Sequence, residues 1–171
     1  SLDNSDYFGI RLSLDGNRLA VGAVHGDGND GSGDEGEVYL YTFTDNVFSG
    51  AALAGIIGEG YSGGKNINQS LDNSEEFGSG LSLDGNRLAV GATNDDGLNN
   101  SASNTGAVYL YTFTDSAFSG GKLDGIIGEG YSGGQNLNQS LAGADKFGVG
   151  VSLDGNRLAV GARGGDGSGN S

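Results

Sequence analysis

Acidic side chains crowd one loop of the chain, and carboxylate oxygens are the ligands that calcium prefers. The loop carries Asp27, Asp30 and Asp34, and a later copy of it carries Asp95 and Asp96. We take these five residues as the candidate metal ligands, with calcium as the candidate ion. The alternative is a solvated acidic loop in which Asp and Asn favour turns. No EF-hand spacing and no Gly-Gly-x-Gly-x-Asp nonapeptide is present to support the metal.

Catalytic chemistry is not expected. His25 is the only histidine, and Asn94 and Gly164 stand at its place in later copies of the sequence. Cysteine is absent, so neither a disulfide nor a thiolate metal site can form. No nucleophile, base and orienting residue recur together. We therefore expect no enzymatic activity, no catalytic residue and no organic cofactor.

One arginine follows the same short turn in each copy of the sequence. These arginines are Arg18, Arg87 and Arg157, and the aspartates that precede them in the turn are Asp15, Asp84 and Asp154. We expect each arginine to pair with its aspartate or to reach an adjacent unit. The alternative is a ring of arginines that face a ligand.

Two tyrosines have the residue types that suit sugar binding. Tyr61 and Tyr131 each lie in the sequence Gly-Glu-Gly-Tyr-Ser-Gly-Gly. Tyrosine offers an apolar ring and a hydroxyl, which together form a platform for a sugar. Packing against a neighbouring unit explains the two residues equally well.

The elements that position these residues come from an internal repeat. Ten residues, Ser13–Gly22, recur letter for letter at Ser82–Gly91 and at Ser152–Gly161. The Phe-Gly pair that precedes each copy begins at residues 8, 77 and 147, which gives periods of 69 and 70 residues. Such periods are typical of supersecondary units that cannot bury their apolar face without a neighbour. We predict two full units, 1–69 and 70–139, and a partial unit, 140–171, that holds only the first hairpin.

Each unit reads as a series of strands. Residues 10–14 and 18–23 alternate around the turn Asp15-Gly16-Asn17, which predicts a β-hairpin. Residues 38–44 are β-branched and aromatic, which predicts a strand that is covered on both faces. Residues 48–57 fit a fourth strand or a short helix, and glycine favours the strand. Residues 58–71 read as a long connection that Ile67 and Leu71 anchor to the core.

Composition limits the partners. The net charge is −14, with 8 Lys plus Arg against 22 Asp plus Glu. Nucleic acids and anionic membranes both require a basic footprint, so we expect neither as a partner. The 36 glycines come without any proline and stand beside the strand patterns, where they serve turns and close packing. No apolar run is long enough to span a bilayer and no signal peptide is present, so any targeting segment is expected outside this sequence.

The order of these motifs resembles the FG-GAP repeat. The shared features are the Phe-Gly pair, an apolar strand, Leu-Ala-Val-Gly-Ala, and then Gly106-Ala-Val-Tyr-Leu-Tyr111, with Gly36-Glu-Val-Tyr-Leu-Tyr41 in the first unit. FG-GAP repeats are the blades of integrin-type seven-bladed β-propellers. The sequence looks most like bacterial versions in large secreted or surface proteins of the filamentous-haemagglutinin, two-partner secretion type.

Two features depart from the integrin-type pattern. The resemblance implies a calcium loop of the Asp-x-Asp-x-Asp-Gly kind between the first two strands, where this chain has only the turn Asp15-Gly16-Asn17. One carboxylate cannot supply the six to eight oxygens that calcium takes. In addition, two and a half blades cannot close a ring.

We therefore predict an all-β fold of tandem four-stranded antiparallel blades like those of a β-propeller, or alternatively an open β array or fibre. The expected function is a structural and adhesive repeat segment of a large bacterial secreted or cell-surface protein. Its expected partners are neighbouring repeats or copies of itself. The alternative function is a propeller that binds a glycan or a surface protein through its variable loops, with or without calcium.

Overall fold

The computed structural model describes residues 2–29, 31 and 33–165, and nearly all of its regular structure is β-sheet. The described residues contain no α-helix; one short 3₁₀ turn, η1, spans Leu98–Asn100. No helix among them is long and apolar enough to cross a membrane. The prediction of an all-β fold is confirmed.

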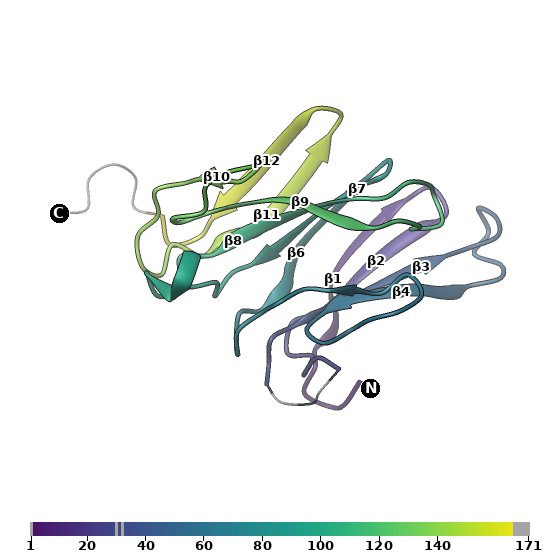
Figure 1. Ribbon diagram of the computed structural model, residues 1–171. Coiled ribbons are helices and arrows are strands. Elements are labelled where there is room, and N and C mark those ends of the chain that lie inside the picture. Colours follow the sequence, from purple (N-terminus) through teal and green to yellow (C-terminus); the bar gives the residue numbers. More distant parts are fainter. Residues whose placement is uncertain (1, 30, 32, 166–171) are drawn as a thin grey trace.

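The strands form three separate sheets that follow one another along the chain (Figure 1). The first sheet contains β1 (Phe8–Asp15), β2 (Arg18–Ala23), β3 (Glu37–Thr42), β4 (Ala52–Gly58) and β5 (Ile67–Asn68). The second contains β6 (Phe77–Asp84), β7 (Arg87–Ala92), β8 (Ala107–Thr112), β9 (Lys122–Gly128) and β10 (Leu137–Asn138). The third is the hairpin of β11 (Phe147–Asp154) and β12 (Arg157–Ala162). Each sheet falls inside one of the three units defined from the sequence, and none closes into a barrel.

The first hairpin of each unit forms where the alternating pattern predicts it. Leu12 lies opposite Val21, and Val21 lies opposite Tyr39 on β3, so these three side chains share one face. Gly16 adopts a φ of 59° in the turn, a conformation that glycine takes without steric cost. A bulge after Phe8 coincides with Gly9, whose φ is 90°.

The number of strands differs from the prediction. Four strands of each full unit form the expected antiparallel meander, and the segment that could have been a helix is the strand β4. A fifth strand of two residues was not predicted. It lies within residues 58–71, where Ile67 pairs in parallel with Ile57. This strand could not be predicted, because two residues are too few to show the alternating pattern of a strand.

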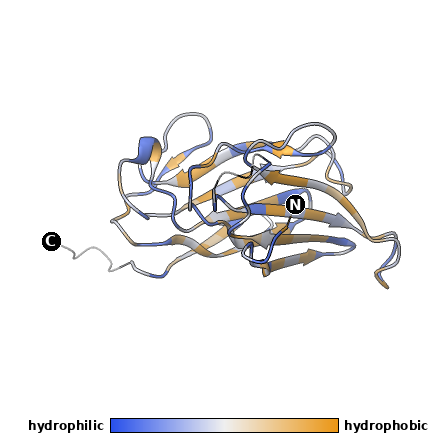
Figure 2. Cartoon of the chain, turned by 90° about the horizontal axis from the view of Figure 1, so that it is seen from below, coloured by the Kyte–Doolittle hydropathy of each residue, from blue (hydrophilic) through white to orange (hydrophobic). Residues whose placement is uncertain are grey.

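The three sheets pack face to face. β6 packs against β1 and β2 of the first unit, and β11 packs against β6 and β7 of the second unit. Hydrophobic residues concentrate on the strands and hydrophilic residues on the loops (Figure 2). The main core therefore lies between sheets rather than inside one of them. Its members include Leu40 and Ile57 from the first unit and Phe77, Leu88 and Tyr111 from the second.

A glycine on β2 and β7 allows the close approach of neighbouring units. A Cβ on Gly22 would lie 2.4 Å from the carbonyl oxygen of Gly78, and a Cβ on Gly91 would lie 2.0 Å from that of Gly148. Both distances are far below van der Waals contact, so any larger residue would push the sheets apart. The repeated Leu-Ala-Val-Gly sequence thus ends in glycine because the next unit's backbone lies against it.

Candidate functional site

The contact between consecutive units is itself repeated. Ser13 Oγ accepts a hydrogen bond from the Leu83 backbone N–H at 2.8 Å, and Asp15 Oδ2 accepts one from the Gly85 N–H at 2.9 Å. The same bonds join the second unit to the third, at 2.9 Å from Leu153 to Ser82 and 3.0 Å from Gly155 to Asp84. The thrice-repeated Ser-Leu-Asp-Gly is therefore the part of each unit that holds the next one.

Aromatic side chains of the second unit complete its contact with the first. The Phe118 ring is fully buried, and the Arg18 Cζ lies 5.6 Å from its centroid. This geometry is that of a cation–π contact. Two further bonds cross the contact, from Lys65 Nζ to the Ala117 carbonyl at 2.6 Å and from the Tyr111 hydroxyl to Gln69 Oε1 at 2.6 Å.

The first unit has an exposed apolar side, which we call the leading face. It consists of Phe8, Ile10, Leu12 and Leu14 on β1, which are 44%, 46%, 61% and 54% exposed. The residues on β6 equivalent to Phe8, Leu12 and Leu14 are Phe77, Leu81 and Leu83. They are only 0%, 9% and 6% exposed, because the first unit covers them. The leading face of the first unit thus corresponds to the surface by which the second unit binds the first.

A second open surface, the trailing groove, lies between the second unit and the third hairpin. This cavity of about 310 Å³ is lined by Arg87, Leu110 and Asp124 of the second unit and by Leu153 and Arg157 of the third. Leu40, which corresponds to Leu110, is fully buried, whereas Leu110 is half-buried. The difference arises because β8 and Phe118 cover the first unit, while the described part of the third unit ends after its hairpin.

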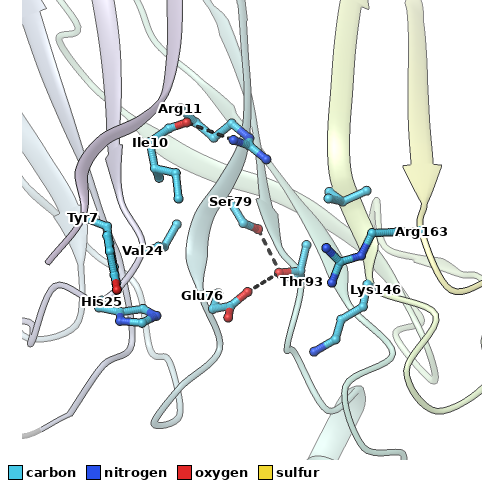
Figure 3. A pocket seen from close by; sticks show the side chains of 11 residues that line it. Tyr7, Ile10, Arg11, Val24, His25, Glu76, Ser79, Thr93, Lys146 and Arg163 are labelled. Carbon is cyan, nitrogen blue, oxygen red and sulfur yellow. Dashed lines mark hydrogen bonds between the residues drawn. The ribbon is translucent and has the colours of Figure 1, made fainter. Parts of the chain in front are cut away.

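A pocket of about 270 Å³ collects side chains from all three units (Figure 3). It lies where the first hairpins of the units begin and end, and we call it the inner pocket. The first unit contributes Tyr7, Ile10, Arg11, Val24 and His25; the second contributes Glu76, Ser79 and Thr93; the third contributes Lys146, Val149 and Arg163. Tyr7 and His25 stand on one side in Figure 3, with Lys146 and Arg163 on the other and Glu76 between them.

Hydrogen bonds order the middle of the inner pocket. The Thr93 hydroxyl donates to Glu76 Oε2 at 2.6 Å, and the Thr93 backbone N–H donates to Ser79 Oγ at 3.1 Å (Figure 3). Lys146 Nζ donates to the amide oxygens of Asn94 and Asn104, both of which are neutral. The lysine is therefore held in place without being neutralised.

Residues 3–41 and 71–111 match the family model of the FG-GAP repeat. The two full units are FG-GAP-like repeats. The two matched segments start before the Phe-Gly pair of each full unit and end on β3 and β8. The FG-GAP match agrees with stacked sheets of the blade type, and such repeats are typical of adhesive or structural domains of extracellular or surface proteins. No curated protein matches the chain.

The calcium loop of integrin-type FG-GAP blades does not fit the residues found here. Asp15 Oδ2 accepts hydrogen bonds from Arg18 Nη2 at 2.5 Å and from the Gly85 N–H. Asp84 does the same with Arg87 at 2.7 Å and with Gly155. These carboxylates link one FG-GAP unit to the next instead of holding an ion. The predicted Asp–Arg pairing is confirmed for Arg18 and Arg87.

The five candidate calcium ligands do not gather in one site. Asp27 lies with Asp3 and Asp6, and carboxylate oxygens of the three are all within 4.8 Å of one another. Asp34 is exposed, and Asp30 lies outside the described residues. In the second unit, Asp96 Oδ1 accepts the Asn104 N–H at 2.6 Å, and buried Asp95 accepts the Gly97 N–H at 2.8 Å. Calcium binding by these residues stays a prediction.

Asp95 has a structural partner set that the sequence did not reveal. Its Oδ2 accepts hydrogen bonds from the Tyr109 hydroxyl at 2.7 Å and the Tyr131 hydroxyl at 3.1 Å. In the first FG-GAP unit the corresponding tyrosines, Tyr39 and Tyr61, instead donate to Glu37, at 2.6 and 2.8 Å. Burial raises the pKa of all four tyrosines, and the adjacent carboxylate raises it further.

The two units thus build one buried Tyr–carboxylate–Tyr trio from different positions. Gly26 corresponds to Asp95, and Ala107 corresponds to Glu37, so the carboxylate has moved from β3 to the preceding loop. A Cβ on Gly26 would lie 2.7 Å from Glu37 Cγ, which shows that the two positions compete for the same space. The hydroxyls of Tyr61 and Tyr131 are therefore engaged inside the blade. Sugar binding by these two residues stays a prediction.

Glu75 is a buried carboxyl that sequence reasoning did not single out as a site. It is 7% exposed, and its Oε2 has no hydrogen-bond partner among the described residues. Burial, with the nearby Asp95 charge as the second cause, raises the pKa of Glu75 to about 8. Burial likewise raises the pKa of Asp6, the residue at the same position of the first unit.

Sequence reasoning also missed the inner pocket, although a signal for it is present. Its eleven lining residues come from repeat positions 7, 10, 11, 24 and 25 of the first-unit numbering. None of these five positions holds the same residue in all three units, whereas residues 13–23 recur unchanged. Comparing the copies for difference, rather than for identity, would have pointed to this pocket.

Proposed function

We propose that the chain is a structural and adhesive repeat segment of a large bacterial extracellular or cell-surface protein. In this role its FG-GAP units stack one upon another, and the leading face receives a further unit of the same kind. The FG-GAP match supports the coarse assignment. The bacterial surface setting rests on the resemblance of the motifs to bacterial exoproteins, with which the net charge of −14 is compatible.

The observation that carries the proposal is the repetition of the contact between units. Ser13 and Ser82 each bind the backbone of the next unit, at 2.8 and 2.9 Å, and Asp15 and Asp84 repeat this at 2.9 and 3.0 Å. A contact that repeats in the same sense along a chain has no built-in end, because each new unit offers the same surface again. Ser152 of the third unit offers the same acceptor to a following unit.

The apolar leading face supports the same role. Contiguous exposed apolar residues on a soluble protein mark a surface that binds a partner. The corresponding surface of the second unit is covered by Ala20, Val38 and Leu40 of the first. A partner of the same repeat type therefore matches the leading face in shape and in chemistry. No catalytic reaction is part of this proposal.

Sedimentation velocity of the 171-residue chain over a range of concentrations tests the proposal. We expect elongated, concentration-dependent assemblies that form end to end. Leu12→Glu places a charge on the leading face and should abolish association. Leu98→Glu is the matched control, because Leu98 is also exposed but lies in η1, away from that face. A compact monomer at every concentration, or equal association of both variants, would contradict the proposal.

A further inference from the structure

The inner pocket carries an inference that is independent of end-to-end stacking. It begins with where the units differ. Position 7 of the repeat is Tyr7, Glu76 or Lys146 in the three units, and position 24 is Val24, Thr93 or Arg163. These differences meet in one cavity, to which each unit contributes a different chemical group.

The charges in the pocket are not a sample of the chain's composition. The chain has 8 Lys plus Arg against 22 Asp plus Glu. The pocket reverses this ratio, with Arg11, Lys146 and Arg163 against Glu76. A pocket that drew its charges at the ratio of the whole chain would hold mostly acidic residues, so the excess of basic residues sets this pocket apart.

Among the residues that the structure describes, no carboxylate forms an ion pair with the positive charges of the pocket. The ion pairs among the described residues are Arg18–Asp15, Arg87–Asp84 and Lys122–Asp124, all outside the pocket. Arg11 donates to the Ile10 carbonyl at 2.9 Å, and Lys146 donates to two amide oxygens. Cations held by neutral acceptors attract an anion. The strong negative charge of the rest of the chain repels an extended polyanion, whereas a small anion can bind within the pocket alone.

The backbone presents position 7 at an energetic cost. Tyr7, Glu76 and Lys146 have φ values of 52°, 56° and 55°, in the left-handed region that favours glycine. The left-handed backbone costs a residue with a Cβ about 1–2 kcal/mol. Non-glycine residues persist in such conformations only where the surrounding structure enforces them, and they cluster at functional sites. Here the conformation places all three side chains in the pocket.

The remaining walls suit a sugar ring. Tyr7 is 59% exposed and stands edge-on to His25, with ring centroids 4.8 Å apart. Ile10, Val24 and Val149 add apolar surface. Glu76 brings carboxylate oxygens that can accept hydrogen bonds from sugar hydroxyls. At about 270 Å³ the pocket lies just below the roughly 300–1,000 Å³ of small-molecule sites, so it admits one small unit.

We propose that the inner pocket binds an anionic sugar, namely one saccharide unit that carries a carboxylate. Arg163 and Lys146 bind the carboxylate of the sugar, and the apolar wall with Tyr7 packs against the sugar ring. Glu76 accepts hydrogen bonds from the sugar hydroxyls. The site differs from the variable loops and from Tyr61 and Tyr131, which the sequence had suggested for glycan binding.

Isothermal titration calorimetry of the 171-residue chain with three probes tests this site. The probes are methyl glucuronide, methyl glucoside and sodium acetate. We expect methyl glucuronide to bind at least about tenfold more tightly than either of the others, because only it offers both a carboxylate and a ring. Equal binding of the glucoside would overturn the role of charge, and equal binding of acetate would overturn the role of the sugar.

Two variants assign the binding to this pocket. Arg163→Gln removes an exposed cation and should weaken methyl glucuronide binding about tenfold, as expected for a hydrogen bond to a charged group. Lys122→Gln is the matched control, since Lys122 is exposed and pairs with Asp124 outside the pocket. Unchanged binding by Arg163→Gln, or an equal loss in Lys122→Gln, would overturn the proposal. Binding in the inner pocket does not require end-to-end stacking, so the calorimetry tests this proposal separately from the sedimentation experiment.

Discussion

The first and second units have almost the same sequence and fold, yet the same side chains have opposite surroundings. Leu14 and Leu83 are equivalent residues at the ends of β1 and β6, and only Leu83 is buried. Phe48 and Phe118 show the same contrast, because Phe118 is covered by Arg18 of the preceding unit. The comparison teaches that an FG-GAP unit of this chain is stabilised from outside, by the unit before it.

The largest effect is expected at the paired phenylalanines. Phe118→Ala should lower the free energy of unfolding by about 3–5 kcal/mol, because it removes a fully buried ring from the contact between units. Phe48→Ala should cost less than about 1 kcal/mol, because Phe48 is exposed. Denaturant unfolding followed by tyrosine fluorescence, at concentrations too low for end-to-end association, measures both. Similar losses at the two sites would show that the units are stabilised internally.

The equivalent acids Glu75 and Asp6 sharpen the comparison through pH. Burial raises the pKa of Glu75 to about 8, above the ordinary value of 4.5. The folded state therefore binds this proton more tightly than the unfolded state. The protonated Glu75 therefore makes its full contribution to the stability of the fold below about pH 4.5, and this contribution is lost as the pH rises through 8.

We expect Glu75→Gln to be more stable than the parent at pH 9 by about 2–4 kcal/mol, and to lose this advantage near pH 4. Asp6→Asn should show a smaller change, because Asp6 Oδ2 already accepts the Asp3 N–H at 2.8 Å. Melting temperatures at the two pH values provide the test. A Glu75→Gln advantage that does not depend on pH would contradict the buried, protonated carboxyl.

The close glycine contact gives the next prediction. Gly91→Ala should cost about 1–3 kcal/mol, because the new Cβ would meet the Gly148 carbonyl oxygen at 2.0 Å. Gly161→Ala is the matched control in the same repeat position, where the nearest atom would be 3.7 Å away. Thermal unfolding of the two variants distinguishes them. If Gly161→Ala is as harmful as Gly91→Ala, the contact between units is not the reason for the glycine.

The exchanged carboxylate gives a smaller effect with a defined rescue. Glu37→Ala should cost about 2 kcal/mol, because it leaves the buried hydroxyls of Tyr39 and Tyr61 without their acceptor. Adding Gly26→Asp, which copies Asp95, should restore about 1 kcal/mol of this loss. Gly26→Asp alone should destabilise, since its Cβ would collide with Glu37. Additive losses in the double variant would show that the two trios are unrelated.

Much of this fold could be predicted from the sequence, because it depends on local patterns. The hairpin around Gly16 follows from alternation and a turn that accepts positive φ, and the aromatic strand β3 follows from β-branched and aromatic residues. The strand β5 could not be found, because its two residues pair only in the tertiary structure. The role of Asp95 could not be predicted either, because the sequence of an acidic loop is the same whether the carboxylate is solvated or accepts hydrogen bonds from two buried tyrosines.

The sequence shows which repeat positions differ at the inner pocket, but it does not show that these positions meet in space. Tyr7, Glu76 and Lys146 stand 69 and 70 residues apart, and no local pattern connects them. Only the stacking of the units brings them together. The repeat therefore predicts the scaffold, while the few positions that escape the repeat hold the candidate chemistry.

The most direct test of the account is to give the first unit a neighbour. A further copy of residues 70–139, fused ahead of Ser1, recreates the junction that precedes the third unit. In the 171-residue chain, at concentrations too low for end-to-end association, Leu14→Ala should cost less than about 0.5 kcal/mol, because Leu14 is exposed. In the extended chain the account predicts a cost of about 2–5 kcal/mol, as for a buried leucine. A cost that stays below about 0.5 kcal/mol in the extended chain would contradict the claim that the leading face binds another FG-GAP unit.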